Sequence, residues 1–576
     1  MAVVANGASR YRIVVPDEPD PVTGFAAGEL QRFLADISGA TLPIVREGEA
    51  GAEAAFLLGP TARARATGSM ERLARLGEDG VSLQTAGRDV VLLGQNQRGQ
   101  LYSVYVLLER FLGVRFLARD CTVIPRQDTV ALPAIDYLHA PPFSYRETLY
   151  YDSFPADIAA RQRLNGPASA CNATVGGKVV IHPYVHSFAQ LVPPEKHFAQ
   201  HPEYFSLVGG KRTDATVHGQ LCLTNPEVLE IATARVERWI EEHPDISIFD
   251  VSQNDGEGAC ECADCAAVVQ EEGSQSGPIL RFVNAIADVV AARYPGKWVE
   301  TLAYAYSVKP PARTRPRDNV IIRLCHEGCY FHGIERCRRG ADFLSHIEEW
   351  RQLARRLFVW HYATNFHHYV APNPNLEGLA RDIKCYAARG VEGLMIQGNY
   401  QCPGGELAEL RQYLAAQLMW DPEREPEAIR EEFCRGYYGS AADAVLEYLA
   451  VLDRAAEDPN VHAFCAWDPQ ETVTPELVAA GLEILAPARA RANTAEEAGR
   501  ILRVLLPLWY MQLTYPDRYA LAPADAPRLL REFRSVAAAN QTTYIGEGFS
   551  GENMPRWLAK VESHGGDMSN ASTAET

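Results

Sequence analysis

The sequence lacks several features that would define whole classes of protein. It holds no apolar run of the length that a transmembrane helix requires. Basic residues number 55 against 73 acidic ones, and the formal net charge of -18 argues against binding to nucleic acid phosphates. Residues 1–20 lack the charged and apolar segments of a secretory signal. We therefore expect a cytoplasmic protein whose partners include neither membranes nor nucleic acids.

Cysteine is sparse, with 13 residues scattered along the chain except for one cluster. Without an export signal, thiols or metal ligation are favoured over a disulfide framework. Cys260, Cys262 and Cys265 are closely spaced, and Cys222 lies in an earlier apolar run, so the four thiolates could bind a structural zinc. Reduced thiols or one disulfide are the alternatives. A looser set is interpreted as packing residues: Cys325, Cys329, His332 and Cys337.

The hydrophobic pattern changes twice along the chain. Up to about residue 137, short apolar runs alternate with two amphipathic stretches, 25–37 and 99–112, which is typical of a small α/β domain. Beyond Trp420, leucine and alanine recur at helical spacing. The predicted division is a small α/β domain (1–137), a catalytic barrel (138–420), a helical domain (421–564) and a disordered tail (565–576).

The central region alternates short apolar runs with helical stretches, which is the pattern of parallel strands with crossover helices. Eight candidate strands predict an α/β fold in the form of a (β/α)8 TIM-like barrel. The candidate strands are residues 143–151, 178–185, 220–225, 246–253, 297–306, 319–327, 356–366 and 392–399.

Polar and aromatic side chains gather where these predicted strands end. Such ends meet at one face of a barrel, where enzymes of this architecture build their sites. Aromatic rings stack on the C–H faces of sugars, and amides or acids bind the hydroxyl groups, so this inventory predicts a polyhydroxylated ligand. For any single residue, a role in the core is the alternative. The residues expected to hold the sugar are His186, Asn254, Tyr304, Trp360, Tyr362, Asn365 and Gln397.

Glycosidic cleavage normally requires two carboxyl groups. Asp255 and Glu257 follow the fourth predicted strand, and Glu327 follows the sixth. A 2-acetamido group on the substrate can itself act as the nucleophile, and the enzyme then needs one acid and a second carboxylate that orients the amide. Residues two apart on an extended segment point the same way, although Gly256 and Gly258 allow the chain to turn. Asp255 is the preferred acid/base because it lies nearer the strand.

Several segments resemble a bacterial family known as a domain of unknown function. They are HPEYFSLVGGKR (201–212), QLCLTNPEV (220–228), SQNDGEGACECADC (252–265), CYFHG (329–333) and residues 362–375. That family resembles glycoside hydrolases and includes endo-β-N-acetylglucosaminidases that act on N-glycans. Residues 30–117 resemble the small α/β domain that precedes the barrel in β-hexosaminidases and α-glucuronidases.

The resemblance implies a retaining, substrate-assisted glycosidase with its acids after the fourth barrel strand, where Asn254 and Asp255 match the family pattern. The sequence departs from the β-hexosaminidases in lacking their adjacent Asp-Glu pair at this position. The expected substrate is an oligosaccharide or another amino-sugar-containing compound, and catalysis is expected to need no cofactor.

Three alternatives remain open. The first is an inverting α-glucuronidase-like hydrolase, in which Asp255 or Glu257 is the acid and Glu327 activates water. In that enzyme Arg146 or Arg323 would bind the sugar carboxylate. The second is a non-catalytic carbohydrate-binding barrel that keeps the aromatic residues, and the third is a zinc hydrolase.

Overall fold

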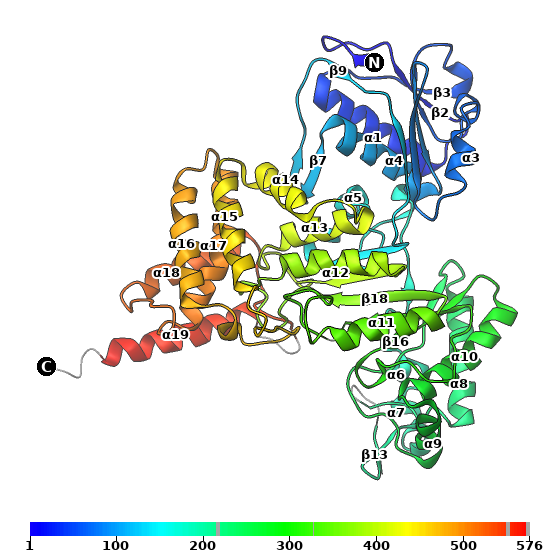
Figure 1. Ribbon diagram of the computed structural model, residues 1–576, viewed down its shortest axis with the longest axis vertical. Helices are drawn as coiled ribbons and strands as arrows, with labels where there is room; N and C mark the ends of the chain where they lie inside the picture. The colour runs from blue at the N-terminus through cyan, green and yellow to red at the C-terminus, as the bar shows by residue number, and fades with distance from the viewer. Residues whose placement is uncertain (215–218, 327, 549–552, 572–576) are drawn as a thin grey trace.

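The structure, a computed structural model, describes residues 1–214, 219–326, 328–548 and 553–571. Figure 1 shows the N-terminal region in blue at the top, the central region in colours from cyan to yellow-green, and the C-terminal helices in yellow, orange and red at the left. One hydrophobic core runs through all of them, from Val3 to Trp557, so the regions pack against one another rather than being joined by bare linkers.

The N-terminal region is a six-stranded mixed sheet in the order β10-β5-β6-β4-β2-β3. Two long helices, α1 and α4, pack together beside it. Helix α1 begins where the Asp20 carboxylate accepts hydrogen bonds from two backbone amides, four residues before the predicted stretch 25–37, and it ends at Gly39 in the left-handed conformation. The elements are β1 (Ala2–Val4), β2 (Arg12–Val15), α1 (Pro21–Ser38), β3 (Ile44–Arg46), β4 (Ala55–Leu58), α2 (Ala62–Arg65), α3 (Ser69–Leu73), β5 (Val81–Ala86), β6 (Asp89–Gly94), α4 (Gln97–Leu112), β7 (Arg115–Ala118), β8 (Cys121–Val123), β9 (Val130–Ala131) and β10 (Asp136–His139).

The central region holds a parallel sheet in the order β11-β19-β18-β17-β16-β15-β12. Its strands are β11 (Tyr145–Leu149), β12 (Ile181–His182), β15 (Ile248–Asp250), β16 (Trp298–Ala303), β17 (Val320–Cys325), β18 (Arg356–Tyr362) and β19 (Gly393–Gln397). The short strands β13 (Leu207–Val208) and β14 (Lys211–Arg212) form a separate hairpin.

The parallel sheet is curled rather than flat. In a flat sheet its outer strands β11 and β12 would lie roughly 29 Å apart, at about 4.8 Å per strand. Instead, the guanidinium carbon of Arg323 lies 5.5 Å from the ring centre of Tyr145 on β11 and 5.5 Å from that of Tyr184, just after β12. Side chains from all seven strands therefore share one interior cluster.

Within the described residues the central sheet contains seven parallel strands, not the eight predicted, and no strand pairing closes β11 against β12. The predicted strand at 220–225 is absent because β12 pairs directly with β15, Ile181 opposite Ile248, which leaves no place between them. Leu221 forms only a single bridge to Phe205, and Asn225 instead caps the following helix.

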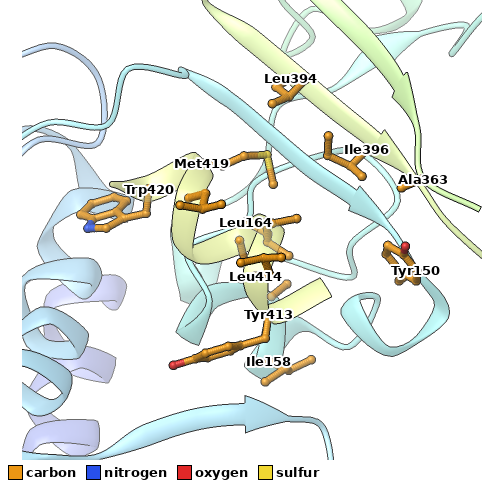
Figure 2. Close-up of a cluster of buried hydrophobic side chains, with 14 of the residues drawn as sticks. Tyr150, Ile158, Leu164, Ala363, Leu394, Ile396, Tyr413, Leu414, Met419 and Trp420 are labelled. Atoms are coloured by element: carbon orange, nitrogen blue, oxygen red, sulfur yellow. The ribbon is translucent and has the colours of Figure 1, made fainter. Parts of the chain in front are cut away.

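Helices cover the outside of the curled sheet and connect its strands. Among them α13 is buried along its whole length: in Figure 2 its Met419 lies toward Leu394 and Ile396 of β19, and its Tyr413 lies on the far side, toward Ile158. The helices of this region are α5 (Ala156–Arg161), α6 (Phe188–Leu191), α7 (Pro194–His197), α8 (Pro226–Glu242), α9 (Ala263–Glu272), α10 (Ser276–Arg293), α11 (Ala341–Leu353), α12 (Leu376–Ala388) and α13 (Ala408–Trp420).

After Trp420 the regular elements are helical. They are α14 (Pro426–Tyr438), α15 (Ala442–Ala455), α16 (Pro475–Ala490), α17 (Ala495–Thr514), α18 (Ala526–Ala539) and α19 (Met554–Ala571). Helix α19 continues past residue 564, into the segment for which the sequence predicts disorder, and residues 572–576 lie outside the described part of the chain. Within the described residues, no helix combines the length and apolarity that crossing a bilayer would need.

Candidate active site

A cavity of about 720 Å³ opens at the carboxyl ends of the parallel strands. We call it the strand-end cavity. All seven strands or the loops that follow them contribute to its lining, and segments from farther along the chain complete the wall. The lining residues are Leu149, Pro167, Ala168, Tyr184, Val185, His186, Asp255, Leu302, Tyr304, Cys325, Trp360, Tyr362, Phe366, Gln397, Tyr400, Cys465 and Glu547.

Among the described residues, two carboxyl groups line this cavity. Asp255 follows β15, and its Oδ1 accepts a hydrogen bond of 2.9 Å from the Tyr304 hydroxyl. Glu547 lies between α18 and α19, and its Oε1 accepts a bond of 2.9 Å from the Tyr400 hydroxyl. Burial raises the pKa of Glu547, and the negative charge of Asp255 raises it further, whereas the Tyr400 hydrogen bond lowers it. A carboxyl group with a raised pKa can serve as a proton donor near neutral pH.

Backbone contacts hold Glu547 against the loop that follows β18. Its amide donates a 2.6 Å hydrogen bond to the Phe366 carbonyl. The preceding Gly546 lies so close that a Cβ there would stand 2.6 Å from the carbonyl oxygen of His367. Glycine is therefore required for this approach, and it brings a residue of the C-terminal region into a cavity built by the central sheet.

Aromatic rings form much of the remaining wall. The Trp360 indole donates a 2.8 Å hydrogen bond to Gln397 Oε1, which fixes the plane of the ring. Its ring centre lies 6.2 Å from that of Tyr362 and 6.0 Å from that of Tyr184. The predicted ligand residues His186, Tyr304, Trp360, Tyr362 and Gln397 all line the cavity. Such a wall can stack against the apolar face of a sugar ring.

The two predicted asparagines lie behind the cavity wall instead. Asn254 is 3% exposed, its Oδ1 accepts a bond from the Ala189 amide, and its Nδ2 donates to the Gly219 carbonyl. Asn365 likewise accepts from the His367 amide and donates 2.9 Å to the Trp467 carbonyl. Both side chains use their polar groups on the backbone, so they shape the loops that carry Asp255 and Phe366 rather than facing a ligand.

The structure separates the predicted pair of carboxylates. Glu257 is exposed and does not line the cavity, because Gly256 and Gly258 have φ angles of 109° and 96° and turn the chain after Asp255. Glu327 lies outside the described residues. Sequence analysis missed Glu547, which belongs to a region read as purely helical. The glycines on either side of it, in a non-helical segment, were the available signal.

The four predicted metal ligands converge. One sulfur from each of Cys222, Cys260, Cys262 and Cys265 lies within 4.8 Å of the others, and we call these residues the four-cysteine set. The Cys260 sulfur accepts a bond of 3.4 Å from the Leu207 amide. Amide donors and four thiols in reach of one point fit a tetrahedral zinc. The set joins the segment before α8 to the loop after β15.

This architecture, a curled parallel sheet with a cavity at its strand ends, is a mixed α/β fold similar to that of glycoside hydrolases. A family GH115 4-O-methyl-α-glucuronidase with specificity for decorated arabinogalactans is similar over 95% of this chain and 78% of its own, with a TM-score of 0.61 and 12% identity. The structure of CpGH84B is similar over 93% of this chain and 94% of its own chain, with 10% identity and a TM-score of 0.49.

The chain belongs to the family described as a domain of unknown function (DUF4838), whose model matches residues 116–450. The model for the glycosyl hydrolase family 67 N-terminus matches residues 5–107. These matches confirm the family resemblance noted in the sequence. No curated protein matches the chain.

Proposed function

We propose that this protein is a glycoside hydrolase that cleaves N-acetylhexosamine-containing glycans in the strand-end cavity by a retaining, substrate-assisted mechanism. One observation carries the proposal: Asp255 and Glu547 line the same aromatic cavity, and the charge of one raises the pKa of the other. Such a reaction requires one carboxyl group that can donate a proton and a second that orients the acetamido group.

In this mechanism the carbonyl oxygen of the 2-acetamido group attacks the anomeric carbon. The bond to the leaving oxygen breaks as Glu547 transfers its proton to that oxygen. Asp255, held by Tyr304, accepts a hydrogen bond from the amide N–H and stabilises the positive charge that develops on the ring formed by the acetamido group. Water then attacks the anomeric carbon and gives a proton back to Glu547, so the configuration is retained. Because its pKa is raised, we assign the role of proton donor to Glu547. The sequence analysis preferred Asp255 for this role.

An α-glucuronidase-like activity is the second candidate, since the similar GH115 structure is that of an α-glucuronidase. A glucuronate carboxylate would need a cation. Neither arginine suggested by the sequence lines the cavity: Arg146 is fully buried against Asp79, and Arg323 is fully buried against Glu300. Among the described lining residues there is no lysine or arginine, and the negative charge of Asp255 would repel an acidic sugar. A neutral amino sugar suits this charge distribution better.

The test is hydrolysis of 4-nitrophenyl N-acetyl-β-D-glucosaminide beside the matching glucoside and glucuronide. Oligosaccharides with an internal N-acetylglucosamine belong in the panel because an endo-acting enzyme can ignore small aryl glycosides. Turnover that requires the 2-acetamido group supports the proposal. Turnover of the glucuronide alone supports the second candidate, and binding of oligosaccharide without any turnover would identify a non-catalytic carbohydrate-binding barrel.

We also propose that the four-cysteine set binds a structural zinc. The zinc would fasten the loop after β15, which carries Asp255, to the segment before α8. It would take no part in bond cleavage, because its four ligands leave no open position for water or substrate.

A further inference from the structure

A second group of metal-binding side chains lies where the central region meets the C-terminal helices. One ligand atom from each of Cys329, His332, Cys337 and His462 lies within 4.8 Å of the others. We call these residues the cysteine–histidine set. Three belong to the segment between β17 and α11, and His462 belongs to the segment between α15 and the short 3-10 helix Pro469–Glu471. We propose that this set binds a second structural Zn²⁺, independent of the glycosidase proposal.

Each sulfur of the cysteine–histidine set lies close to an imidazole nitrogen, which supports a metal site. The Cys329 sulfur lies 3.6 Å from His332 Nδ1, and the Cys337 sulfur lies 3.4 Å from His462 Nδ1. The two sulfurs are buried and the two imidazoles are half-buried. Two thiolates and two imidazoles arranged about one point are a common structural set for tetrahedral zinc.

A hydrogen bond orients one of the imidazoles for ligation. His332 Nε2 lies 3.1 Å from the carbonyl oxygen of Asp458. A carbonyl only accepts, so Nε2 must carry the hydrogen, and in the neutral ring Nδ1 then holds the lone pair that faces Cys329. Metal-binding histidines characteristically donate their other ring N–H to a carbonyl or carboxylate in this way.

Sequence analysis interpreted this region as packing, and the two cysteines do pack with Phe331, Ala463 and Trp467. Apolar packing accounts for the burial of the thiols. It does not account for two histidine nitrogens directed at them from segments far apart in the chain. Metal ligation accounts for both.

A third group, formed by His326, His361 and Asp382, is a weaker candidate. Its two histidine Nδ1 atoms lie 3.0 Å apart, and His361 Nδ1 is also 3.0 Å from the Tyr386 hydroxyl. These nitrogens already hydrogen-bond within a fully buried network, so the group carries no metal proposal.

The position of the cysteine–histidine set indicates its role. The segment that carries His462 continues to Cys465, which lines the strand-end cavity and whose carbonyl accepts a bond of 2.7 Å from the Phe366 amide. The Tyr330 amide donates a 3.0 Å hydrogen bond to the Ala463 carbonyl, and the Tyr330 ring contacts the Tyr362 ring. A zinc here would lock a segment of the helical region onto the strand ends and so hold one wall of the cavity.

The first test needs no variant. We expect the full-length protein, purified under reducing conditions with zinc supplied, to contain two zinc ions per chain by elemental analysis. X-ray absorption at the zinc edge should then give an average of three sulfur ligands at about 2.3 Å and one nitrogen ligand at about 2.0–2.1 Å per zinc. A spectrum with sulfur ligands alone would overturn the proposal, and so would a zinc-free protein.

The second test assigns the site. In a Cys262→Ser/Cys265→Ser background, which removes the four-cysteine set, one zinc should remain with two sulfur and two nitrogen ligands. Adding Cys337→Ser and His462→Gln should abolish that remaining zinc. Cys434→Ser, at a buried cysteine on α14 outside both sets, is the matched control and should leave the zinc content unchanged. Retention of zinc after the loss of Cys337 and His462 would overturn the assignment.

If the Cys262→Ser/Cys265→Ser background does not fold, the Cys337→Ser/His462→Gln change is made in the wild type. One zinc bound by sulfur alone should remain. A zinc that keeps nitrogen ligands in that variant, or two retained zinc ions, would contradict the proposal. Neither readout depends on catalytic activity, so a failure here is distinct from a failure of the proposed function.

Discussion

Glu547 and Asp255 line one cavity although they come from distant parts of the chain, and the charge of Asp255 contributes to the raised pKa of Glu547. Each carboxyl group accepts a hydrogen bond from a different tyrosine, Tyr304 for Asp255 and Tyr400 for Glu547. The two carboxyl groups therefore have different hydrogen-bond donors and still interact electrostatically. Because their surroundings differ, we expect different effects when each is replaced.

Replacing the two carboxyl groups should have different consequences for different leaving groups. Glu547→Gln removes the proton donor, and we expect a loss of about 10²–10⁴-fold in kcat/KM on oligosaccharides. An aryl glycoside with an acidic phenol leaving group needs little protonation, so most of its turnover should survive. Asp255→Asn should impair both substrates alike because it weakens the stabilisation of the acetamido group.

Glu257→Gln is the control for this comparison, since Glu257 is exposed and lies outside the cavity lining, and it should behave as wild type. The kinetics of hydrolysis on both substrates provide the measurement. If Asp255→Asn spares the activated glycoside and Glu547→Gln does not, the two roles are exchanged.

The alkaline limb of the pH profile should respond to Tyr400. The hydrogen bond from Tyr400 favours the ionised form of Glu547 and so lowers its pKa. In Tyr400→Phe the pKa of Glu547 rises, the acid remains protonated to higher pH, and the alkaline limb of kcat/KM should shift upward. Tyr184→Phe, which changes another tyrosine of the cavity wall, should leave that limb in place. An unchanged or downward-shifted limb in Tyr400→Phe would count against Glu547 as the acid.

Gly546→Ala should disrupt catalysis without changing any polar group. The added Cβ would meet the backbone carbonyl oxygens of His367 at 2.6 Å and of Phe366 at 2.7 Å, which cannot move as a flexible side chain would. The segment that carries Glu547 must then shift, and a shift of about 1 Å can cost roughly 10²-fold in rate. Gly499→Ala, at a helical glycine with open space around it, is the matched control and should keep full activity. Equal activity of both variants would show that Glu547 is not positioned by this contact.

Removing one member of the buried Arg323–Glu300 pair should destabilise the fold more than replacing both members together. Both side chains are fully buried inside the curled sheet, where Arg323 Nη2 donates a 3.1 Å hydrogen bond to Glu300 Oε2. Arg323→Met leaves a carboxyl group buried without its cation and should cost about 3–5 kcal/mol. The double change Glu300→Gln/Arg323→Met should recover much of that loss. Thermal unfolding midpoints test this, and a double variant no more stable than Arg323→Met would refute it.

Removal of zinc from the four-cysteine set should lower stability and spare the chemistry. The Cys262→Ser/Cys265→Ser variant, which loses this zinc and keeps the cysteine–histidine set, should have a thermal midpoint lower by roughly 5 °C or more, because a structural zinc contributes folding free energy. Initial rates measured below that midpoint should stay within about twofold of the wild type, since a site with four protein ligands activates no water. Loss of all turnover in the folded variant would instead indicate that this zinc takes part in the hydrolysis.

The sequence alone was sufficient for features that depend on local pattern. The alternation of short apolar runs with helical stretches predicted the parallel strands of the central region, and strand-end residues such as Trp360, Tyr362 and Gln397 do line one cavity. This succeeded because parallel strands all present their carboxyl ends at one face, so order along the chain maps onto position in space. The four-cysteine set was likewise predictable, because three of its members are close in sequence.

Only the tertiary structure decided what depends on contacts between distant segments. The run at 220–225 has the composition of a strand, yet the direct pairing of β12 with β15 excludes it from the sheet. The glycines around Glu547 mark its segment as non-helical, but nothing in the local sequence of Glu547 or His462 places these residues near Asp255 or Cys337. Their positions follow from the packing of the C-terminal helices on the strand ends. A local sequence pattern shows which face of a helix or strand is apolar. Which other element packs against that face depends on the packing of the whole chain.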